Sequence, residues 1–313
     1  ELTGEALRDY VNNAQNLFKT EVPKESYRNR LMSAEHVGQP ADAVFKADVP
    51  VSVALPASFD ARTQWPACTS IGYIRDQSDC GSCWAFGAAE AMTDRVCIAT
   101  AGAQQPILSA DDLLSCCGLS CGIGCKGGFN LRAWNYMLQH GICTGGGFYD
   151  NIGCKPYPFE PCGTHTVDGT THYRNCSGVA DPPTPKCTSE CTNAAYPKAY
   201  ADDKYYAKSA YAVKNDVEAI KQEIFQNGPV EAGFRVYEDF DYYKGGIYQH
   251  TSGALLGGHA VKVIGWGEEN GTPYWLAANQ WAVEWGEQGF FRIILGQNEC
   301  GFEAGIVAGL PMV

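Results

Sequence analysis

The pattern of apolar and polar positions differs between three stretches of the chain, and the first covers residues 1–54. Apolar side chains there recur at intervals of three and four residues, as on one face of a helix. These positions are Leu7, Tyr10, Val11, Ala14 and Phe18. A second short helix is expected around Leu31, before an irregular stretch from residue 38 to residue 56.

The second stretch, residues 55 to about 210, predicts helices joined by long loops. An apolar, Ala-rich run predicts a helix that begins at Cys83. Ser109, followed by two acidic residues, is typical of a helix start, and residues 131–139 predict a helix that ends before Gly141. Residues 154–191 are rich in Pro, Gly, Thr and Cys with little periodicity, so we expect a loop region held by disulfides.

The third stretch, residues 211–313, predicts mainly strands. Residues 261–263 alternate in polarity, and residues 273–278 and 290–295 form the short apolar runs of buried strands. Residues 217–225 are the exception and predict a helix before a Gly-Pro pair. The fold class is therefore α+β, with a mainly helical half, 55–210, and a mainly β half, 211–313.

Composition narrows the class of protein. No run of 18 apolar residues occurs, so no membrane span is expected, and no basic-then-apolar leader stands at the start of this numbering. The formal charge of −12 argues against nucleic acid as a partner and suits an acidic compartment. Fifteen cysteines favour an oxidising, secretory-pathway history.

The candidate chemistry centres on one cysteine. Cys83 ends the motif Cys-Gly-Ser-Cys and is expected at a helix N-terminus, where unpaired N–H groups and the helix dipole favour a thiolate. A thiolate nucleophile needs a base and a group that orients the base, and His259 and Asn279 offer both. All three meet only if the two halves pack face to face, with a cleft between them. A redox or metal-binding pair of Cys80 and Cys83 is the alternative.

Several separated motifs, in the same order, resemble those of the cathepsin B-like cysteine proteases of the papain family. The motifs are Leu55–Arg62, Arg75–Cys80, Cys80–Trp84, Cys125–Gly128, Gly257–Ala260, Asn279–Trp281 and Trp285–Gly286. The resemblance implies a papain-like peptidase over residues 55–313, with the active-site cleft between its halves. It also implies that residues 1–54 are an inhibitory prosegment lying in that cleft, antiparallel to substrate. An ordinary helical subdomain is the alternative for residues 1–54.

The resemblance also assigns roles to single residues. Cys83 would be the nucleophile and His259 the proton shuttle, with Asn279 orienting the imidazole. Gln77 would donate a hydrogen bond to the oxyanion, and Trp281 would shield the His–Asn pair from water. The residues expected to contact substrate are Gly127, Gly128, Ala260, Gly305 and His165.

By the same resemblance, twelve of the fifteen cysteines form six disulfides. The expected pairs are Cys68–Cys97, Cys80–Cys125, Cys116–Cys187, Cys117–Cys121, Cys154–Cys191 and Cys162–Cys176. Cys83, Cys143 and Cys300 would then remain outside these pairs. A zinc site in the cysteine cluster of residues 116–125 is the alternative. No metal and no other cofactor is expected.

The spacing of the motifs predicts an insertion. The nucleophile and the base lie 176 positions apart, against about 130–150 for the papain-type signature, and residues 154–191 are the expected place. In cathepsin B this insertion is an occluding loop, whose two adjacent His side chains bind the C-terminal carboxylate of substrate and give dipeptidyl carboxypeptidase activity. Here Thr164 replaces one of them, and His165 remains. Asp76 loses the partner that would tether the loop, so we expect an endopeptidase with weakened exopeptidase activity.

Three further positions depart from the family pattern. Gly305 stands where some relatives carry a Glu that accepts a basic P2 residue, so an apolar or aromatic P2 residue is expected. Glu303 would point elsewhere. Ser78 and Gln280 replace a usual Gly and a usual Ser without removing a reacting group.

These features predict a lysosomal or secreted monomer that acts on peptides and proteins. Its own prosegment and inhibitors of cystatin type are the expected inhibitory partners. Asn175 and Asn270 begin glycosylation sequons. Two alternatives remain: a catalytically silent homologue that serves as a binding or decoy protein, and a thiol–disulfide exchange enzyme that uses Cys80 and Cys83. We expect His36, His140 and His250 to be structural.

Overall fold

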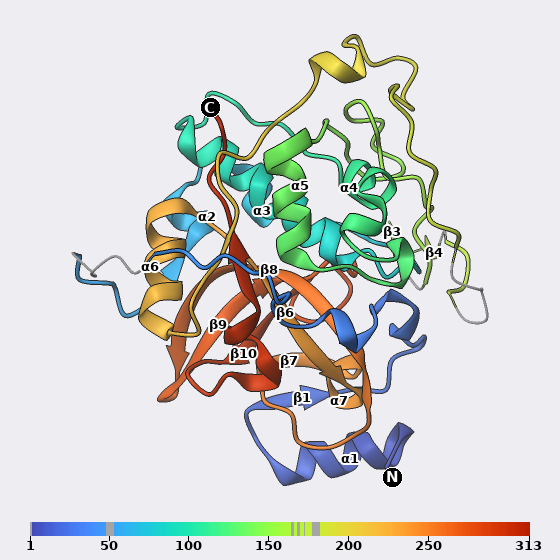
Figure 1. The fold of residues 1–313 in the computed structure, drawn as a ribbon. Coiled ribbons are helices and arrows are strands. Elements are labelled where there is room, and N and C mark those ends of the chain that lie inside the picture. The colour runs from blue at the N-terminus through green and yellow to red at the C-terminus, as the bar shows by residue number, and fades with distance from the viewer. Residues whose placement is uncertain (1, 48–52, 164–165, 168–169, 172, 177–181) are drawn as a thin grey trace.

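The chain builds a layer of helices on one side of a curved sheet (Figure 1), in the order that the sequence predicts. The computed structural model describes residues 2–47, 53–163, 166–167, 170–171, 173–176 and 182–313. Helix α1 lies at the far side of the sheet from helices α3, α4 and α5. None of the described helices is both long and apolar enough to cross a membrane.

Apart from the short helix expected near residue 31, the helices predicted from the sequence are present, with differences in their ends. The α-helices are α1 (Gly4–Ala14), α2 (Ala61–Gln64), α3 (Cys83–Ala99), α4 (Ala110–Cys116), α5 (Asn130–His140), α6 (Val217–Asn227) and α7 (Glu238–Asp241). The Ser109 hydroxyl accepts a hydrogen bond from the Asp112 N–H at 3.0 Å and caps α4. Gly141, with φ of 65°, ends α5.

The prediction for the first helix was wrong beyond residue 14. The Gln15 side chain donates to the Val11 carbonyl at 3.0 Å and accepts from the Phe18 N–H at 3.0 Å, which ends the helix and turns the chain. Phe18 therefore begins a strand, and Tyr10 is 49% exposed. The short helix expected near residue 31 is two 3₁₀ turns, at residues 28–30 and 34–36. The other 3₁₀ turns cover residues 69–72, 118–120, 124–126, 200–202, 299–301 and 303–305.

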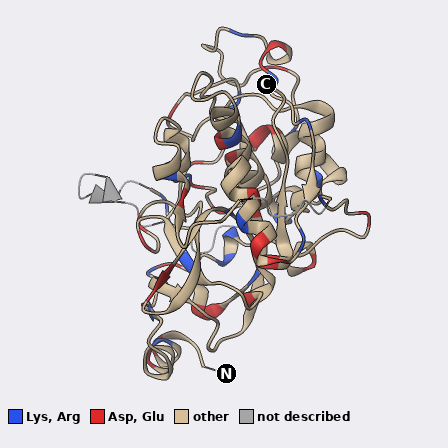
Figure 2. Cartoon of the chain, turned by 90° about the vertical axis from the view of Figure 1, so that its left-hand side faces the viewer, with Lys and Arg blue, Asp and Glu red and all other residues tan. Residues whose placement is uncertain are grey.

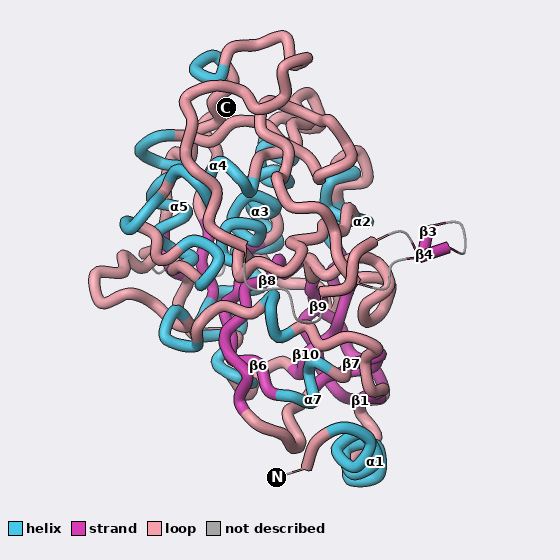
Figure 3. Tube along the Cα trace, turned by 90° about the vertical axis from the view of Figure 1, so that its right-hand side faces the viewer, coloured by secondary structure: helices cyan, strands magenta, loops and turns pink. Residues whose placement is uncertain are grey.

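A nine-stranded sheet forms the other layer, in the order β1-β7-β10-β9-β8-β6-β11-β5, with β2 also paired to β8. Its strands are β1 (Phe18–Thr20), β2 (Phe59–Asp60), β5 (Tyr211–Ala212), β6 (Val230–Tyr237), β7 (Tyr243–Tyr248), β8 (Leu255–Glu269), β9 (Thr272–Ala278), β10 (Phe290–Ile294) and β11 (Ile306–Ala308). The sheet thus takes β1 and β2 from outside residues 211–313. A separate hairpin, β3 (Thr166–Val167) and β4 (Thr170–Thr171), projects from the body (Figure 3).

Buried ion pairs fix α3 against its neighbours. Asp94 on α3 pairs with Lys262 on β8 at 2.7 Å, and Arg95 pairs with Glu223 on α6 at 3.0 Å. All four side chains are almost fully buried, so a shift of α3 would leave charges without partners. This arrangement sets the N-terminus of α3 against the middle of β8.

Candidate active site

Cys83 is the first residue of α3 and is completely buried. Burial raises the pKa of its thiol to about 12, although the backbone N–H groups of Ala260 and Trp84 hydrogen-bond to the sulfur and act in the opposite direction. The contact with Ala260 joins the start of α3 to β8, one residue after His259. The structure therefore places the sulfur beside the strand that carries the candidate base.

His259 and Asn279 form the second part of the site. The His259 Nε2 atom lies 2.7 Å from Asn279 Oδ1, so an accepting amide oxygen leaves the proton on Nε2 and a lone pair on Nδ1. Nδ1 has no hydrogen-bond partner among the described residues. Burial lowers the pKa of His259 to about 4, although the bond to Asn279 raises it. In this state the imidazole is neutral over most of the pH range.

Gln77 carries a side-chain amide that is held from both ends. Its Oε1 atom accepts a hydrogen bond from Trp281 Nε1 at 3.2 Å, and its Nε2 donates to the Cys80 carbonyl at 2.8 Å. The same Nε2 donates to the Arg30 carbonyl at 2.7 Å. A backbone carbonyl of the N-terminal segment thus accepts the hydrogen bond that the sequence analysis assigns to an oxyanion. The Trp281 ring also packs on His259, with the ring centroids 4.7 Å apart.

Residues 26–37, which we call the covering segment, lie across this site. The Tyr27 ring stacks on Trp281 with centroids 4.9 Å apart and an angle of 5° between the planes. Met32 exchanges backbone hydrogen bonds with Gly258, of 3.0 and 2.8 Å, as an added strand would. The Ser33 N–H donates to the Lys126 carbonyl at 3.1 Å. The covering segment therefore runs from Trp281, past Gly258, to the turn that precedes Gly127.

Arg30 anchors the covering segment, and sequence reasoning did not identify it. Its guanidinium is almost fully buried, pairs with Asp76 at 2.9 Å and donates to the Cys162 carbonyl at 2.8 Å. The sequence carried a partial signal, because a weaker tether between Asp76 and the loop was expected. Arg30 of the N-terminal segment is one partner of Asp76.

The expected substrate-binding glycines allow close approach of backbone. A side chain at Gly127 would meet His36 and Met32 of the covering segment within 2.8 Å, and Gly127 has φ of 127°. A side chain at Gly305 would meet the Gly233 carbonyl at 2.0 Å. Gly128 packs against the Trp84 ring. Ala260 contacts Cys83 as described above, and His165 lies outside the described residues.

Six disulfides join the cysteine pairs that the family resemblance implied. They are Cys68–Cys97, Cys80–Cys125, Cys116–Cys187, Cys117–Cys121, Cys154–Cys191 and Cys162–Cys176. Cys83, Cys143 and Cys300 are free thiols. The cluster at residues 116–125 therefore offers no free thiolate for zinc, and Cys80 is bound to Cys125, which argues against an exchange pair with Cys83.

Comparison with known proteins identifies the family. A model of the papain family of cysteine proteases matches residues 55–310. Cathepsin B-like cysteine proteinase 4 of Caenorhabditis elegans is 53% identical, over 99% of this chain and 93% of its own length. The gut-specific cysteine proteinase of the same organism is 52% identical, over 100% and 92%. The structure of procathepsin B S9 from Trypanosoma congolense has a TM-score of 0.83 and 36% identity, over 99% of this chain and 98% of that one.

The chain belongs to the cathepsin B-like cysteine proteases of the papain family. Its α+β fold of two halves is the papain-like fold that the sequence analysis predicted, and the likeness to a procathepsin extends over the N-terminal segment. Like the proteins of this family, it is an enzyme that hydrolyses peptide bonds.

The departures from the cathepsin B-like pattern now have physical explanations. Ser78 has φ of 55°, a backbone conformation that favours glycine, which explains why the family usually has Gly at this position. Its hydroxyl donates to the Glu160 carbonyl at 2.7 Å, and Arg174 pairs with the adjacent Asp79 at 2.6 Å. These two contacts attach residues of the inserted loop to the turn that precedes the nucleophile. Gln280 is buried and donates to the Ala260 carbonyl at 2.7 Å.

The histidines outside the site have structural surroundings. The His36 ring packs on Phe129 at 5.0 Å, and His140 packs on Tyr136 at 4.7 Å. His250 contacts Asp239 at 3.0 Å and stacks on Tyr237. These contacts agree with the structural roles expected for all three.

Proposed function

We propose that this protein is the precursor of an endopeptidase in which Cys83 attacks the scissile carbonyl and His259 carries the proton. Asn279 orients the imidazole, and Trp281 covers the His–Asn contact. The observation that carries the proposal is the hydrogen bond from Gln77 Nε2 to the Arg30 carbonyl. A side-chain donor that already binds a carbonyl oxygen of the covering segment can bind the developing oxyanion of a substrate.

The proposed mechanism requires the covering segment to leave. Under it, the thiol and the imidazole are both buried and neutral, with pKa values of about 12 and about 4. When solvent reaches them, desolvation no longer opposes charge, and the proton moves from Cys83 to His259. The thiolate then attacks, Gln77 and the Cys83 backbone N–H stabilise the oxyanion, and His259 protonates the leaving amine.

Residues 1–54 are proposed as the intramolecular inhibitor, and residues 55–313 as the peptidase. The contacts of residues 26–37 with Trp281, Gln77 and Gly258 support this division more than an independent N-terminal subdomain. The boundary near residue 54 stays a prediction, because residues 48–52 lie outside the described residues.

Replacing Arg30 with Ala should weaken this inhibition. The change leaves Asp76 without its buried cation, which we expect to destabilise the closed form by about 2–3 kcal/mol, or about 30–150-fold in its equilibrium with open forms. Labelling of Cys83 by a fluorescent active-site-directed reagent, in the uncut chain at pH 6, measures this change. The matched control is Arg8→Ala, because Arg8 lies on α1, outside the covering segment, and pairs with the exposed Glu5 and Asp9. Equal labelling of both variants would contradict the anchoring role of Arg30.

The proposed P2 preference is apolar or aromatic. Gly305 leaves no acidic side chain at the base of the expected pocket, and Glu303 is buried, where it accepts hydrogen bonds from Trp275 Nε1 at 3.1 Å and the Asn298 N–H at 3.0 Å. We expect the activated protein to cleave a Phe-Arg reporter at least tenfold faster than an Arg-Arg reporter, measured as kcat/KM. Faster cleavage of the Arg-Arg reporter would refute the assignment.

We further propose that endopeptidase activity exceeds dipeptidyl carboxypeptidase activity. Thr164 replaces one of the two imidazoles expected to bind the C-terminal carboxylate of substrate and to tether the loop to Asp76, and His165 is the one that remains. The test is mass spectrometry of one peptide, with free and amidated C-termini, after digestion. Internal cuts in both forms support the proposal, and a ladder of dipeptides from the free form alone would reject it.

The proposed setting is the secretory pathway, in a lysosome or outside the cell. Six disulfides support an oxidising history. Asp and Glu positions are spread over both halves (Figure 2), which fits peptide and protein substrates better than nucleic acid. A monomer, inhibitors of cystatin type and glycosylation at Asn175 or Asn270 remain expectations.

A further inference from the structure

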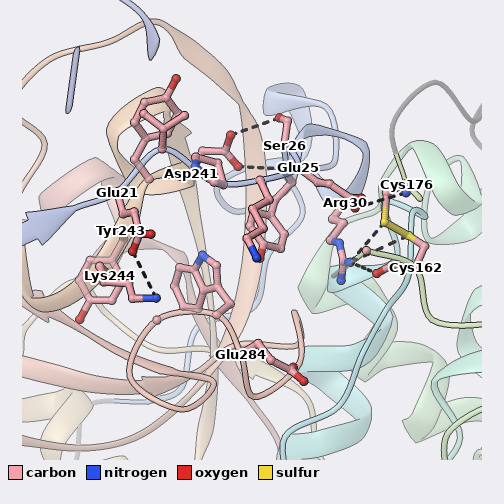
Figure 4. Close-up of a pocket in the computed structure, with 18 residues that line it drawn as sticks. Glu21, Glu25, Ser26, Arg30, Cys162, Cys176, Asp241, Tyr243, Lys244 and Glu284 are labelled. Carbon is pink, nitrogen blue, oxygen red and sulfur yellow. Dashed lines mark hydrogen bonds and ion pairs between the residues drawn. A yellow bond between two sulfur atoms is a disulfide. The ribbon is translucent and has the colours of Figure 1, made fainter. Parts of the chain in front are cut away.

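A pocket of about 260 Å³ lies between the N-terminal segment and the body of the protein (Figure 4). Residues 21–27 and Arg30 form one wall. The other wall carries Asp241, Tyr243, Lys244, Glu284 and Trp285, and the disulfide Cys162–Cys176 lies at one end. Removal of residues 1–54 would therefore turn this pocket into an open part of the cleft.

Asp241 is the buried charge of the body wall. It ends α7 and is only 4% exposed. Its two carboxylate oxygens accept hydrogen bonds from the Tyr27 N–H at 2.9 Å and the Ser26 hydroxyl at 3.2 Å, both in the covering segment. Burial raises the pKa of this carboxyl to about 6, despite those two bonds. The groups that cover Asp241 are thus the ones that leave on activation.

The position of Asp241 along the cleft follows from Tyr27. The backbone of Tyr27 contacts Asp241, and its ring stacks on Trp281. Arg30, three residues later, places its carbonyl on Gln77. Residues 28–30 form a 3₁₀ turn, which rises about 2 Å per residue, so Tyr27 lies roughly 6 Å along the segment from Arg30, whose carbonyl binds the oxyanion donor. An extended substrate covers that length in about two residues.

The other end of the covering segment shows on which side of the scissile bond Asp241 lies. Ser33 and His36 lie at Lys126 and Gly127. Farther along the N-terminal segment, the Gln39 side chain donates to the Ala304 and Ile306 carbonyls at 3.3 Å, on either side of Gly305, where the proposed function places P2. Tyr27 lies at the opposite end and therefore on the leaving-group side. In a bound substrate, Asp241 would therefore face the first two residues after the scissile bond, P1′ and P2′.

The other charged groups at this end of the pocket do not neutralise the charge of the Asp241 carboxylate. Lys244 lines the same wall but is 58% exposed and extends to Glu21 of the N-terminal segment at 3.5 Å, and among the described residues no ion pair joins it to Asp241. Glu284 adds a second carboxylate to the body wall. Glu238, also on α7 and buried, lies 3.7 Å from Arg28 of the covering segment. The covering segment thus places a cation, the Arg28 guanidinium, against an acidic surface of the body at this end of the pocket.

We propose that the activated enzyme selects substrates with Lys or Arg at P1′ or P2′, and that Asp241 is the residue that binds this side chain. The inference rests on the proposed function. A guanidinium or ammonium group replaces the hydroxyl and N–H that Ser26 and Tyr27 donate to the carboxylate, and a charge-assisted bond is the stronger one. This specificity is separate from the P2 preference, which concerns the other side of the scissile bond.

The test compares internally quenched peptides that differ only at P1′ or P2′, with Arg against Leu, at pH 6.5 after acid activation. We expect kcat/KM to be at least tenfold higher for Arg at one of the two positions. Asp241→Asn should bring that ratio to within about twofold of one, by slowing cleavage of the Arg peptide. The matched control is Glu218→Gln, because Glu218 is 60% exposed on α6 and should leave the ratio unchanged. A wild-type ratio near one at both positions, or a ratio that survives Asp241→Asn, would overturn the proposal.

A binding measurement separates this inference from the proposed function. The Cys83→Ala chain, freed of its N-terminal segment with pepsin at pH 4, is titrated with the same peptides by calorimetry. Tighter binding of the Arg peptide, lost in the Cys83→Ala, Asp241→Asn double variant, supports the role of Asp241 even if the wild-type enzyme cuts no peptide. Equal binding of the Arg and Leu peptides overturns it, even if both are cut efficiently.

Discussion

Replacing Cys83 with Ala should reduce kcat/KM of the activated protein by about four to six orders of magnitude. The proposed mechanism forms a covalent bond to this sulfur, and removal of a nucleophile from such a site leaves only the contribution of binding and of the oxyanion donors. Ala fits the space without a clash, so the variant should fold and keep its disulfides. Hydrolysis of the Phe-Arg reporter, with the protein cut to the same length by pepsin, measures the effect.

Cys300→Ala provides the matched control for this experiment. Cys300 is also a free thiol, but it is partly exposed and lies outside the proposed machinery. We expect its replacement to change kcat/KM by less than about twofold. If the Cys83 variant kept its activity, another group would have to be the nucleophile. If the wild-type protein had no activity, the homologue that only binds peptides would become the better description.

Alkylation of Cys83 should be at least about a thousandfold slower in the uncut chain than in the activated protein. At neutral pH, a pKa of about 12 in place of the ordinary 9.0 lowers the thiolate fraction about a thousandfold. Complete burial of the sulfur lowers the rate further. Iodoacetamide labelling, with the modified cysteine located by peptide mass spectrometry, measures this rate.

The dependence of this rate on pH distinguishes ionisation from access alone. Below its pKa, a lone thiol gains thiolate about tenfold per pH unit, so labelling of the uncut chain should rise steadily from pH 6 to pH 9. In the activated protein the imidazolium of His259 stabilises the thiolate, and the rate should stay nearly flat over the same range. A flat and fast profile in the uncut chain would contradict a neutral pair beneath the covering segment.

The sequence predicted most of the fold and of the candidate site, because both depend on local patterns and ordered motifs. The start of α3 at Cys83 and the cap at Ser109 follow from their neighbours alone. The helix end at Ala14 did not, because a single side chain, Gln15, competes there with an apolar repeat that runs on to Phe18. Local periodicity cannot show such competition.

Contacts between distant parts of the chain were the harder part. Arg30 and Asp76 are 46 positions apart, and Asp241 meets Tyr27 across 214 positions. Neither pair lies within one motif, and the sequence alone does not show which distant residue contacts a buried charge. The sequence pointed to a weakened tether at Asp76 without identifying Arg30.

Strand β1 has a consequence for the protein after activation. It is the terminal strand of the large sheet and pairs only with β7, through registers such as Phe18 with Gly246. Loss of residues 1–54 removes this strand and leaves one side of β7 without its backbone partners. The cut that opens the cleft therefore also creates a new sheet edge, where amide hydrogens exchange with water and another extended chain can dock.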